Sequence, residues 1–145
     1  MKMDFIPFEH VGIFKLDDKI EKYTDILSKY KYKPANEYGD EYYYSPEYEA
    51  YYQGHYVMVT EEKICAVFCY GEVIYNNHNL IGLTIDEFEK ITNSNYVGKP
   101  DELDIFEDEP PMYDYEFEEI GVTVTTHYGK INSLTISGHW SYEDD

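Results

Sequence analysis

A pattern that occurs twice constrains the fold of this chain more than any other feature. Gly54 precedes a strand-like segment, and a Lys-Ile pair begins nine residues later at Lys63. Gly121 and Lys130 repeat this arrangement 67 positions further along the chain. Self-similarity at a fixed period is typical of duplicated structural units.

Other short matches follow in the same order, and their offset drifts between about 66 and 70, as loop insertions would make it. We therefore predict a tandem repeat, with a first helix-plus-sheet repeat over 1–75 and a second over 76–145, packed together as one compact unit. The matches pair Val11-Gly12-Ile13 with Ile81-Gly82-Leu83, Ile20-Glu21-Lys22 with Phe88-Glu89-Lys90, Lys33-Pro34 with Lys99-Pro100, and Tyr48-Glu49 with Tyr115-Glu116.

The first half is predicted to start with a helix. Asp17 or Asp18 can cap it, and its apolar positions recur at helical spacing from Ile20 to Tyr30. Alternating and apolar runs then predict four strands, the last two joined by a tight turn at Glu61-Glu62. These strands are expected over 41–45, 48–53, 55–60 and 63–70.

The second half carries a stronger helix signal. Thr84 and Glu87 form a capping box, and the helix should end near Asn93 or Asn95. An edge strand at 73–75 and a linker at Asn76-Asn77 should precede it. Strands are expected over 103–107, 112–118, 121–127 and 130–138, with His127-Tyr128-Gly129 turning the last hairpin. The pattern predicts an α+β fold in which each repeat is a helix followed by antiparallel strands, with the helices packed on one face of the sheet.

The two cysteines, Cys65 and Cys69, lie in an apolar run that is typical of a buried strand. Their Cα atoms would be roughly 13 Å apart there, whereas a disulfide needs about 4.4–6.8 Å. We therefore expect reduced thiols that pack in the core. The chain also lacks an apolar segment long enough for a signal peptide or a membrane span. These features predict a soluble, cytoplasmic protein without membrane association.

Acidic residues dominate one stretch of the second half. Between Lys99 and Lys130 the chain places ten carboxylates and no Lys or Arg. Aromatic residues such as Phe106 and Tyr115 interleave with them, and a purely solvating tail would lack those rings. The net charge of −19 would repel a phosphate backbone, so we expect no direct nucleic-acid binding. Acid and aromatic together predict a folded anionic surface that meets a positive partner.

A Tyr-rich segment in the first half complements this run. Residues 38–56 contain eight Tyr and no Lys or Arg, and at least one of Tyr42, Tyr43 and Tyr44 must face outward from a strand. Tyr is a favoured interface anchor, and carboxylates steer a basic partner. The predicted partner-binding residues are Asp40, Glu41, Tyr43, Glu47, Asp101, Glu102, Asp104, Glu107, Asp108, Glu109, Tyr113, Asp114 and Glu116.

The sequence offers little for catalysis. The five histidines lack metal-ligand spacing such as His-x-x-x-His, and there is no Gly-rich phosphate loop or Gly-x-Ser-x-Gly elbow. The acidic run lacks the alternating ligands and central Gly of an EF-hand. Carboxylate pairs at glycosidase spacing arise by chance among thirty acids. We therefore predict no enzymatic activity, no catalytic residue, no cofactor and no dedicated metal site.

Short motifs in the second half resemble a known repeat. Gly82-Leu83-Thr84 with a short helix, Gly98-Lys99-Pro100-Asp101, and a hairpin closing at Gly129-Lys130-Ile131 look like the repeat of the beta-lactamase inhibitor protein. The same unit appears in small outer-membrane assembly lipoproteins. The resemblance covers roughly 82–137 well and 12–70 more loosely, and it implies a soluble inhibitor scaffold with tandem copies.

In composition the chain also resembles immunity proteins of contact-dependent growth inhibition and related polymorphic-toxin systems. The leading hypothesis is an immunity protein that neutralises a basic bacterial toxin, most concretely a nuclease, by capping its cationic cleft. The alternative is a nucleic-acid mimic of the anti-restriction or anti-CRISPR type, which would need carboxylates spaced like phosphates along an extended surface. A structural or regulatory interaction module is a third class.

Overall fold

The computed structural model describes residues 3–51, 54–103 and 108–138, and its fold belongs to the α+β class with more strand than helix. One sheet has eight strands in the order β10-β11-β12-β13-β7-β6-β5-β4, and all its neighbours are antiparallel. Its strands are β4 (Lys31–Lys33), β5 (Asp40–Tyr44), β6 (His55–Thr60), β7 (Lys63–Cys69), β10 (Val97–Leu103), β11 (Met112–Phe117), β12 (Val122–His127) and β13 (Lys130–Ser137).

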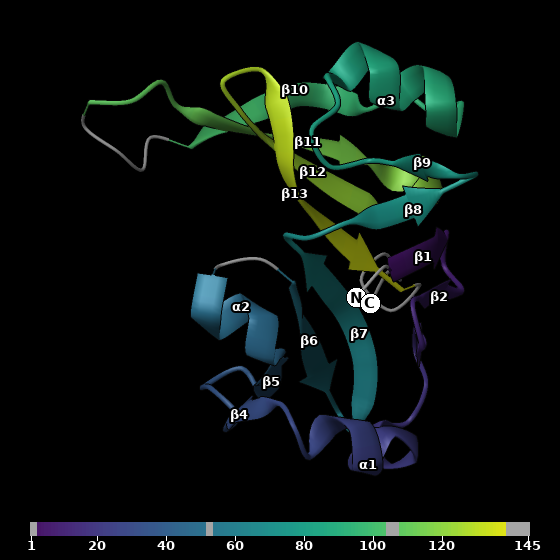
Figure 1. Ribbon diagram of the computed structural model, residues 1–145, viewed down its shortest axis with the longest axis vertical. Coiled ribbons are helices and arrows are strands. Elements are labelled where there is room, and N and C mark those ends of the chain that lie inside the picture. Colours follow the sequence, from purple (N-terminus) through teal and green to yellow (C-terminus); the bar gives the residue numbers. More distant parts are fainter. Residues whose placement is uncertain (1–2, 52–53, 104–107, 139–145) are drawn as a thin grey trace.

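A smaller sheet of five short strands packs beside it, in the order β3-β2-β1-β8-β9. Figure 1 shows α3 at the top of the molecule, α1 at the bottom and the smaller sheet on the right. The remaining elements are β1 (Met3–Ile6), β2 (His10–Val11), β3 (Phe14–Lys15), η1 (Ile20–Tyr23), α1 (Thr24–Leu27), α2 (Pro46–Tyr51), β8 (Val73–Tyr75), β9 (His78–Asn79), α3 (Ile85–Thr92) and η2 (Glu118–Ile120).

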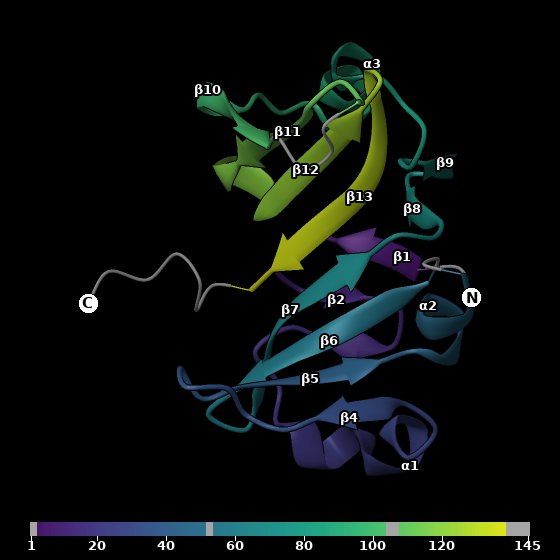
Figure 2. The ribbon, with the colours of Figure 1, turned by 90° about the vertical axis from the view of Figure 1, so that its left-hand side faces the viewer.

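The two halves of the large sheet are built alike. Each half contributes four strands in chain order, and the halves meet where β7 pairs with β13 (Figure 2). In the β6–β7 hairpin Val57 faces Val67, and in the β12–β13 hairpin Val124 faces Leu134. Val124 and Leu134 each lie 67 residues after their counterparts, Val57 and Val67.

Finer details of these hairpins also recur. The register shifts between Met58 and Val59 in one hairpin, and between Thr125 and Thr126 in the other. Both two-residue turns are left-handed: φ is 52° and 63° at 61–62, and 55° and 76° at 128–129. Such turns match the twist of antiparallel strands. The predicted turns of both hairpins are confirmed.

The segment before each helix is fixed in the same way. Ile64 exchanges two backbone hydrogen bonds with 17–18, at 2.7 and 2.9 Å. Ile131 exchanges two with 82–83, both at 2.8 Å. The chain therefore enters each helix from the same place on the sheet.

The hydrophobic core lies on one face of the large sheet. Val57, Val67, Val124 and Leu134 are fully buried on that face, because alternate strand residues point to the same side. Phe14 of β3 and Phe88 of α3 are among the largest side chains in the same cluster. The Phe88 ring lies 4.7 Å from Phe117 of β11.

α3 and η1 begin differently. α3 has the predicted capping box: the Thr84 hydroxyl accepts from the Glu87 N–H, and the Glu87 carboxylate accepts from the Thr84 N–H. It ends, as expected, at Asn93, which is left-handed with φ 51°.

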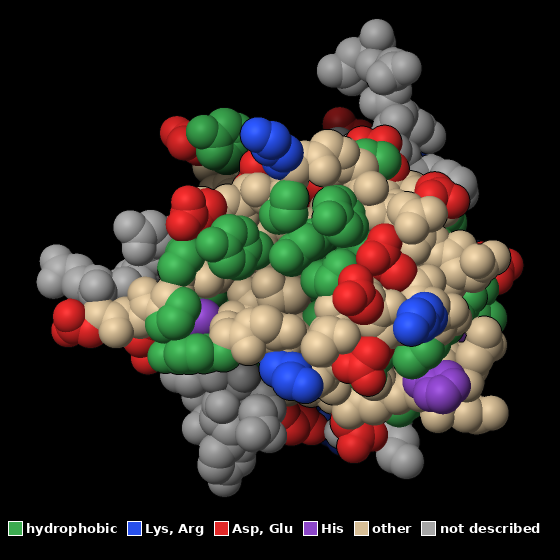
Figure 3. Space-filling model, turned by 90° about the horizontal axis from the view of Figure 1, so that it is seen from above, with side chains coloured by type: hydrophobic (Ala, Val, Ile, Leu, Met, Phe, Trp, Pro, Cys, Tyr) green, Lys and Arg blue, Asp and Glu red, His purple; other side chains and the backbone are tan. Residues whose placement is uncertain are grey.

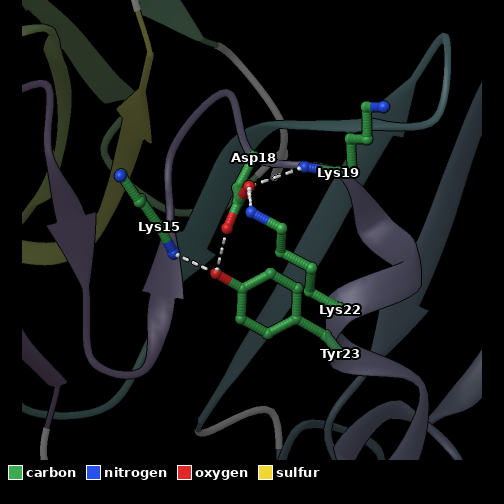
Figure 4. A network of polar contacts seen from close by, with 5 residues as sticks. All are labelled: Lys15, Asp18, Lys19, Lys22 and Tyr23. Carbon is green, nitrogen blue, oxygen red and sulfur yellow. Dashed lines mark hydrogen bonds and ion pairs between the residues drawn. The ribbon is translucent and has the colours of Figure 1, made fainter.

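No side chain caps the N-terminal residue of η1. Instead, the Asp18 carboxylate accepts hydrogen bonds from the Lys19 N–H and the Tyr23 hydroxyl, both at 3.0 Å, and pairs with Lys22 at 2.8 Å (Figure 4). The bond from Lys22 holds the pKa of Asp18 below its usual value. Tyr23 in turn accepts from the Lys15 N–H, which ties η1 to β3.

The first predicted helix, Ile20 to Tyr30, is shorter than expected. It is a 3₁₀ turn followed by a single α-helical turn that ends at Leu27, and Ile26 remains 38% exposed. β4 follows after residues 28–30, and its three residues are too few for a periodic signal in the sequence.

The predicted strand over 48–53 is wrong: α2 occupies Pro46–Tyr51. Ser45 precedes it, and its hydroxyl accepts from the Tyr48 N–H at 3.3 Å, while Pro46 suits the first helical position. The ring of Tyr48 packs on the face of the sheet opposite the core, so the helices do not all lie on one face. The Ser45-Pro46 start therefore favours a helix over the predicted strand.

The predicted strand over 103–107 is also wrong in its bounds, because β10 runs over Val97–Leu103 and 104–107 lies outside the described residues. Gly98 and Pro100 are both residues that weaken a strand. They are accommodated because β10 is an edge strand with a register shift between Val97 and Asp101. The other strands of the second half appear within one residue of their predicted bounds.

The predicted linker at Asn76-Asn77 is the left-handed turn of the β8–β9 hairpin, with φ 48° and 66°. The strand predicted before it, 73–75, is present but lies between β1 and β9 rather than at an edge.

Two of the short sequence matches join positions that differ in structure. Tyr48 is helical, whereas Tyr115 lies in β11. Val11 is the last residue of β2, before the turn of the β2–β3 hairpin, whereas Ile81 directly precedes the segment leading into α3.

Candidate protein-binding face

The second face of the large sheet, which we call the open face, carries the candidate site. Along β6 and β7 the buried Val57 and Val67 alternate with half-buried Tyr56 and Phe68 on the other side. The same alternation continues through the second half. Side chains of the open face are Asp40, Tyr42, Tyr44, Tyr56, Met58, Phe68, Tyr70, Asp101, Asp114, Glu116, Thr123, Thr125, Ser133 and Thr135.

One row of this face crosses all eight strands. Each residue lies directly opposite the next, so the side chains of neighbouring strands are within contact distance. The row changes from aromatic to polar where the two halves meet, between Phe68 and Thr135. In sheet order it is Lys31, Tyr44, Tyr56, Phe68, Thr135, Thr123, Glu116 and Val97.

The aromatic half of the face is a contiguous cluster. Tyr56 stacks on Phe68 at 4.3 Å with an interplanar angle of 8°, and lies 4.9 Å from Tyr44. Tyr48, from α2, closes the cluster at 5.3 Å from Tyr70. We call these rings, with Tyr42, the aromatic cluster: Tyr42, Tyr44, Tyr48, Tyr56, Phe68 and Tyr70.

Burial raises the pKa of Tyr42, Tyr44 and Tyr56 above the usual value, so these three phenols are neutral near pH 7. The cluster therefore offers apolar ring faces together with hydroxyl donors, which is the combination that makes Tyr a frequent interface residue.

In the second half, the open face carries carboxylates on β10 and β11. Asp114 accepts a hydrogen bond from the Thr125 hydroxyl at 2.6 Å, and Glu116 accepts one from Thr123 at 2.7 Å. Asp101 lies directly opposite Asp114. We call Asp101, Asp114 and Glu116 the acidic group. Two like charges facing each other across strands are unfavourable, and a bound cation would relieve that repulsion.

The predicted site residues are divided between the two faces. Asp101, Asp114, Glu116 and Asp40 share the open face, and Asp40 accepts from the Thr60 hydroxyl at 2.6 Å. Glu102 and Tyr113 oppose each other on the other face of the β10–β11 hairpin.

Glu41 and Tyr43 are also on that opposite face, where Tyr43 packs against the core and Glu41 accepts a hydrogen bond from the Tyr32 hydroxyl. They therefore do not join the acidic group. A one-residue difference in a strand decides the face, and the sequence alone could not set the register of Tyr42–Tyr44.

The remaining predicted residues lie outside the sheet. Glu47 is exposed in α2, and Asp108 and Glu109 are exposed in the loop before β11. The Glu109 carboxylate is 3.6 Å from Nε2 of His127. Asp104 and Glu107 lie outside the described residues.

Sequence reasoning missed most of the aromatic cluster. Tyr56 and Phe68 lie in β6 and β7, where the buried residues give the stronger pattern, and Tyr70 directly follows β7. The spacing of Phe68 and Tyr70, two residues apart in or beside a strand, places them on one side. Their contact with Tyr44 and Tyr48 depends on pairing between β5, β6 and β7.

Other reactive groups are placed unfavourably for chemistry. Cys65 and Cys69 are free and buried, and burial raises the pKa of both thiols, that of Cys69 to about 12. Reactive thiolates need the reverse shift. Within 3–51, 54–103 and 108–138, no three His, Cys, Asp or Glu side chains gather as metal ligands.

The end of the molecule that carries α3 is mixed in character. Figure 3 views it from above, with hydrophobic side chains gathered near the centre and acidic ones around them. Near this end, Tyr96 packs on Tyr115 at 5.0 Å and remains 36% exposed. This packing belongs to the core side of the sheet, not to the open face.

Comparisons with protein-family models, with curated proteins and with solved structures found no match. In the described part of the chain, every helix is too short or too polar to cross a membrane.

Proposed function

We propose that this chain is an acidic inhibitor of the immunity-protein type, which binds a basic bacterial toxin, most concretely a nuclease, and covers its cationic cleft with the open face. The observation that carries the proposal is the row across the sheet, which joins an aromatic cluster to an acidic group on one continuous surface.

The two parts of the face would act at different stages of binding. The acidic group, within a chain of net charge −19, attracts a basic partner and speeds encounter. The aromatic cluster supplies large, half-buried rings that lose little entropy on contact, so it slows dissociation. A nuclease cleft, which must hold phosphate, presents the positive charge that this surface complements.

We also infer that the chain is a tandem duplication whose copies have divided these roles. The matching register, bulge and turn of the two hairpins support it. Tyr44 pairs with Tyr56 in the first half, and Glu116 pairs with Thr123 at the corresponding place in the second. Aromatic residues in one copy thus correspond to polar or acidic residues in the other.

The pairing at the centre of the sheet fits this inference. Val67 faces Ile136, and Cys69 faces Leu134. With an offset of 67, Val67 corresponds to Leu134 and Cys69 corresponds to Ile136. Val67 therefore faces the counterpart of Cys69, and Cys69 faces the counterpart of Val67. Two copies related by a pseudo-twofold axis near Phe68 and Thr135 would produce this register.

A nucleic-acid mimic is the alternative function. A mimic needs carboxylates that follow an extended line, like phosphates along a strand. On the open face, the acidic group lies in the second half, and Thr123 and Thr135 separate Glu116 from the ring of Phe68. This arrangement favours binding to one specific protein partner over mimicry of a nucleic acid.

The test is affinity capture from the native host with the full chain, at 0.05 M and 0.5 M salt. The proposal predicts a single basic protein that stays bound at high salt, because rings rather than charges would dominate retention. Its nucleolytic activity should be lost in the complex. Capture of several DNA-binding enzymes that DNA displaces would support mimicry and overturn the immunity assignment.

A further inference from the structure

A second candidate site lies outside the open face, between the β2–β3 turn, α1 and the start of α2. It is a pocket of about 510 Å³, lined by Ile13, Asp25, Ile26, Lys29, Tyr30, Pro46 and Glu47. Its volume is within the range of small-molecule sites, about 300–1,000 Å³.

The wall of the pocket is unusually apolar for this acidic chain. Ile13 is 46% exposed and Ile26 is 38% exposed, and both line the same pocket together with Pro46. A single exposed aliphatic side chain is ordinary on a protein surface, but two that converge on one concave site with a proline make a binding surface.

One wall of the pocket, Tyr30, is paired with a buried histidine. The Tyr30 hydroxyl lies 2.5 Å from Nε2 of His55, a side chain that is 98% buried and packs against Phe14. Burial, followed by the charge of Glu47, raises the pKa of Tyr30 to about 12, so this ring stays neutral. A neutral aromatic wall can receive a cation on its face.

The charges around the pocket select the sign of the ligand. Two carboxylates, Asp25 and Glu47, line it against one ammonium, Lys29. The net charge of −19 adds a field that repels anions throughout the surface.

We propose that this pocket binds a small organic cation, a molecule with an apolar body and a protonated amine. The apolar body would contact Ile13, Ile26 and Pro46, and the amine would lie near Asp25 and Glu47. The proposal concerns this pocket alone and does not depend on the function of the open face.

The experiment uses the full chain with isotope-labelled isoleucine methyl groups, titrated with benzylammonium chloride and followed by NMR. We expect saturable shifts at the Ile13 and Ile26 methyls, with a dissociation constant on the order of 1 mM for a ligand of this size. Two probes separate the contributions: methylammonium has the charge without the ring, and benzyl alcohol has the ring without the charge. Both should bind more weakly than benzylammonium.

Variants locate the site. Ile26→Ser should abolish saturation, whereas Ile6→Ser, which changes a similarly exposed isoleucine on β1, should leave it unchanged. Glu47→Gln should weaken benzylammonium about two- to fivefold and benzyl alcohol hardly at all. Three results would each overturn the proposal: no saturable shift, equal affinity for benzyl alcohol, or shifts of the same size with methylammonium.

Discussion

The two halves of the open face share a backbone plan but differ in chemistry. Tyr44 and Tyr56 face each other in the first half, where Glu116 and Thr123 face each other in the second. Both pairs lie in the same row and on the same side of the sheet. Strand register thus fixes where a side chain points, while the residue at that place decides whether the surface holds a partner by contact or attracts it by charge.

The core beneath the two halves differs too. His55 faces Cys69 in the first half, and Val122 faces Ile136 at the corresponding place in the second. Both His55 and Val122 are buried. The aromatic half therefore contains a buried titratable group where the acidic half has an apolar one.

We expect the largest change in stability from the protonation of His55. Burial lowers the pKa of His55 to about 4, below the value of 6.5 expected in the unfolded chain. Between those values the unfolded state binds more protons, so the contribution of His55 to stability should fall as the pH drops from 6.5 to 4 and then level off. The loss attributable to His55 is about 3 kcal/mol.

Urea unfolding from pH 7.5 to 3.5 checks this prediction. His55→Val copies the second half and removes the histidine, while all carboxylates titrate in both proteins. The difference in unfolding free energy between wild type and variant should therefore shift by the predicted amount over the window from 6.5 to 4. Parallel curves would mean that His55 is protonated in the folded state without cost.

A smaller loss of stability is expected when Tyr56, at the centre of the aromatic cluster, is replaced by Thr, the residue at the corresponding position of the second half. Tyr56→Thr removes a ring that stacks on Phe68 at 4.3 Å and contacts Tyr44 and Tyr48. Because the ring is half-buried, we expect a loss of about 2 kcal/mol in unfolding free energy. Tyr38→Thr, at a side chain 77% exposed, should change it by less than about 0.5 kcal/mol. Equal losses for the two variants would show that the cluster does not pack as one unit.

The smallest effect tests the acidic group. Asp101→Asn removes the charge opposite Asp114 and should stabilise the fold by about 0.5 kcal/mol at low salt. Salt screens this repulsion, so the gain should shrink in 0.5 M salt. Thermal unfolding at two salt concentrations measures it, with Glu37→Gln, an exposed acid in a turn, as the control. A gain that does not respond to salt would place its origin elsewhere.

Much of the fold could be predicted because its signals are local. The capping box at Thr84 and Glu87 and the two hairpin turns depend on residues close in sequence. The α+β class follows from the same patterns. By contrast, α2 and β10 were missed because each breaks a composition rule: α2 is rich in Tyr, and β10 contains Gly98 and Pro100.

The candidate face was less predictable because it is a product of long-range pairing. Asp114 and Glu116 were expected as binding residues, but Glu41 and Tyr43 proved to lie on the opposite face. Only the register between β5 and β6 separates Tyr43 from its neighbours. The meeting of Phe68 with Thr135 joins segments from the two halves, and no local pattern encodes it.

The kinetics of partner binding, with each half of the open face altered in turn, test whether the two halves have divided roles. One variant neutralises the acidic group through Asp101→Asn, Asp114→Asn and Glu116→Gln, and the other truncates a cluster ring through Tyr44→Ser. With the captured basic partner, we predict that the first variant lowers the association rate and its salt dependence, while the second mainly raises the dissociation rate. If both variants change the same rate constant, or neither changes any, the division of roles between the two halves is contradicted.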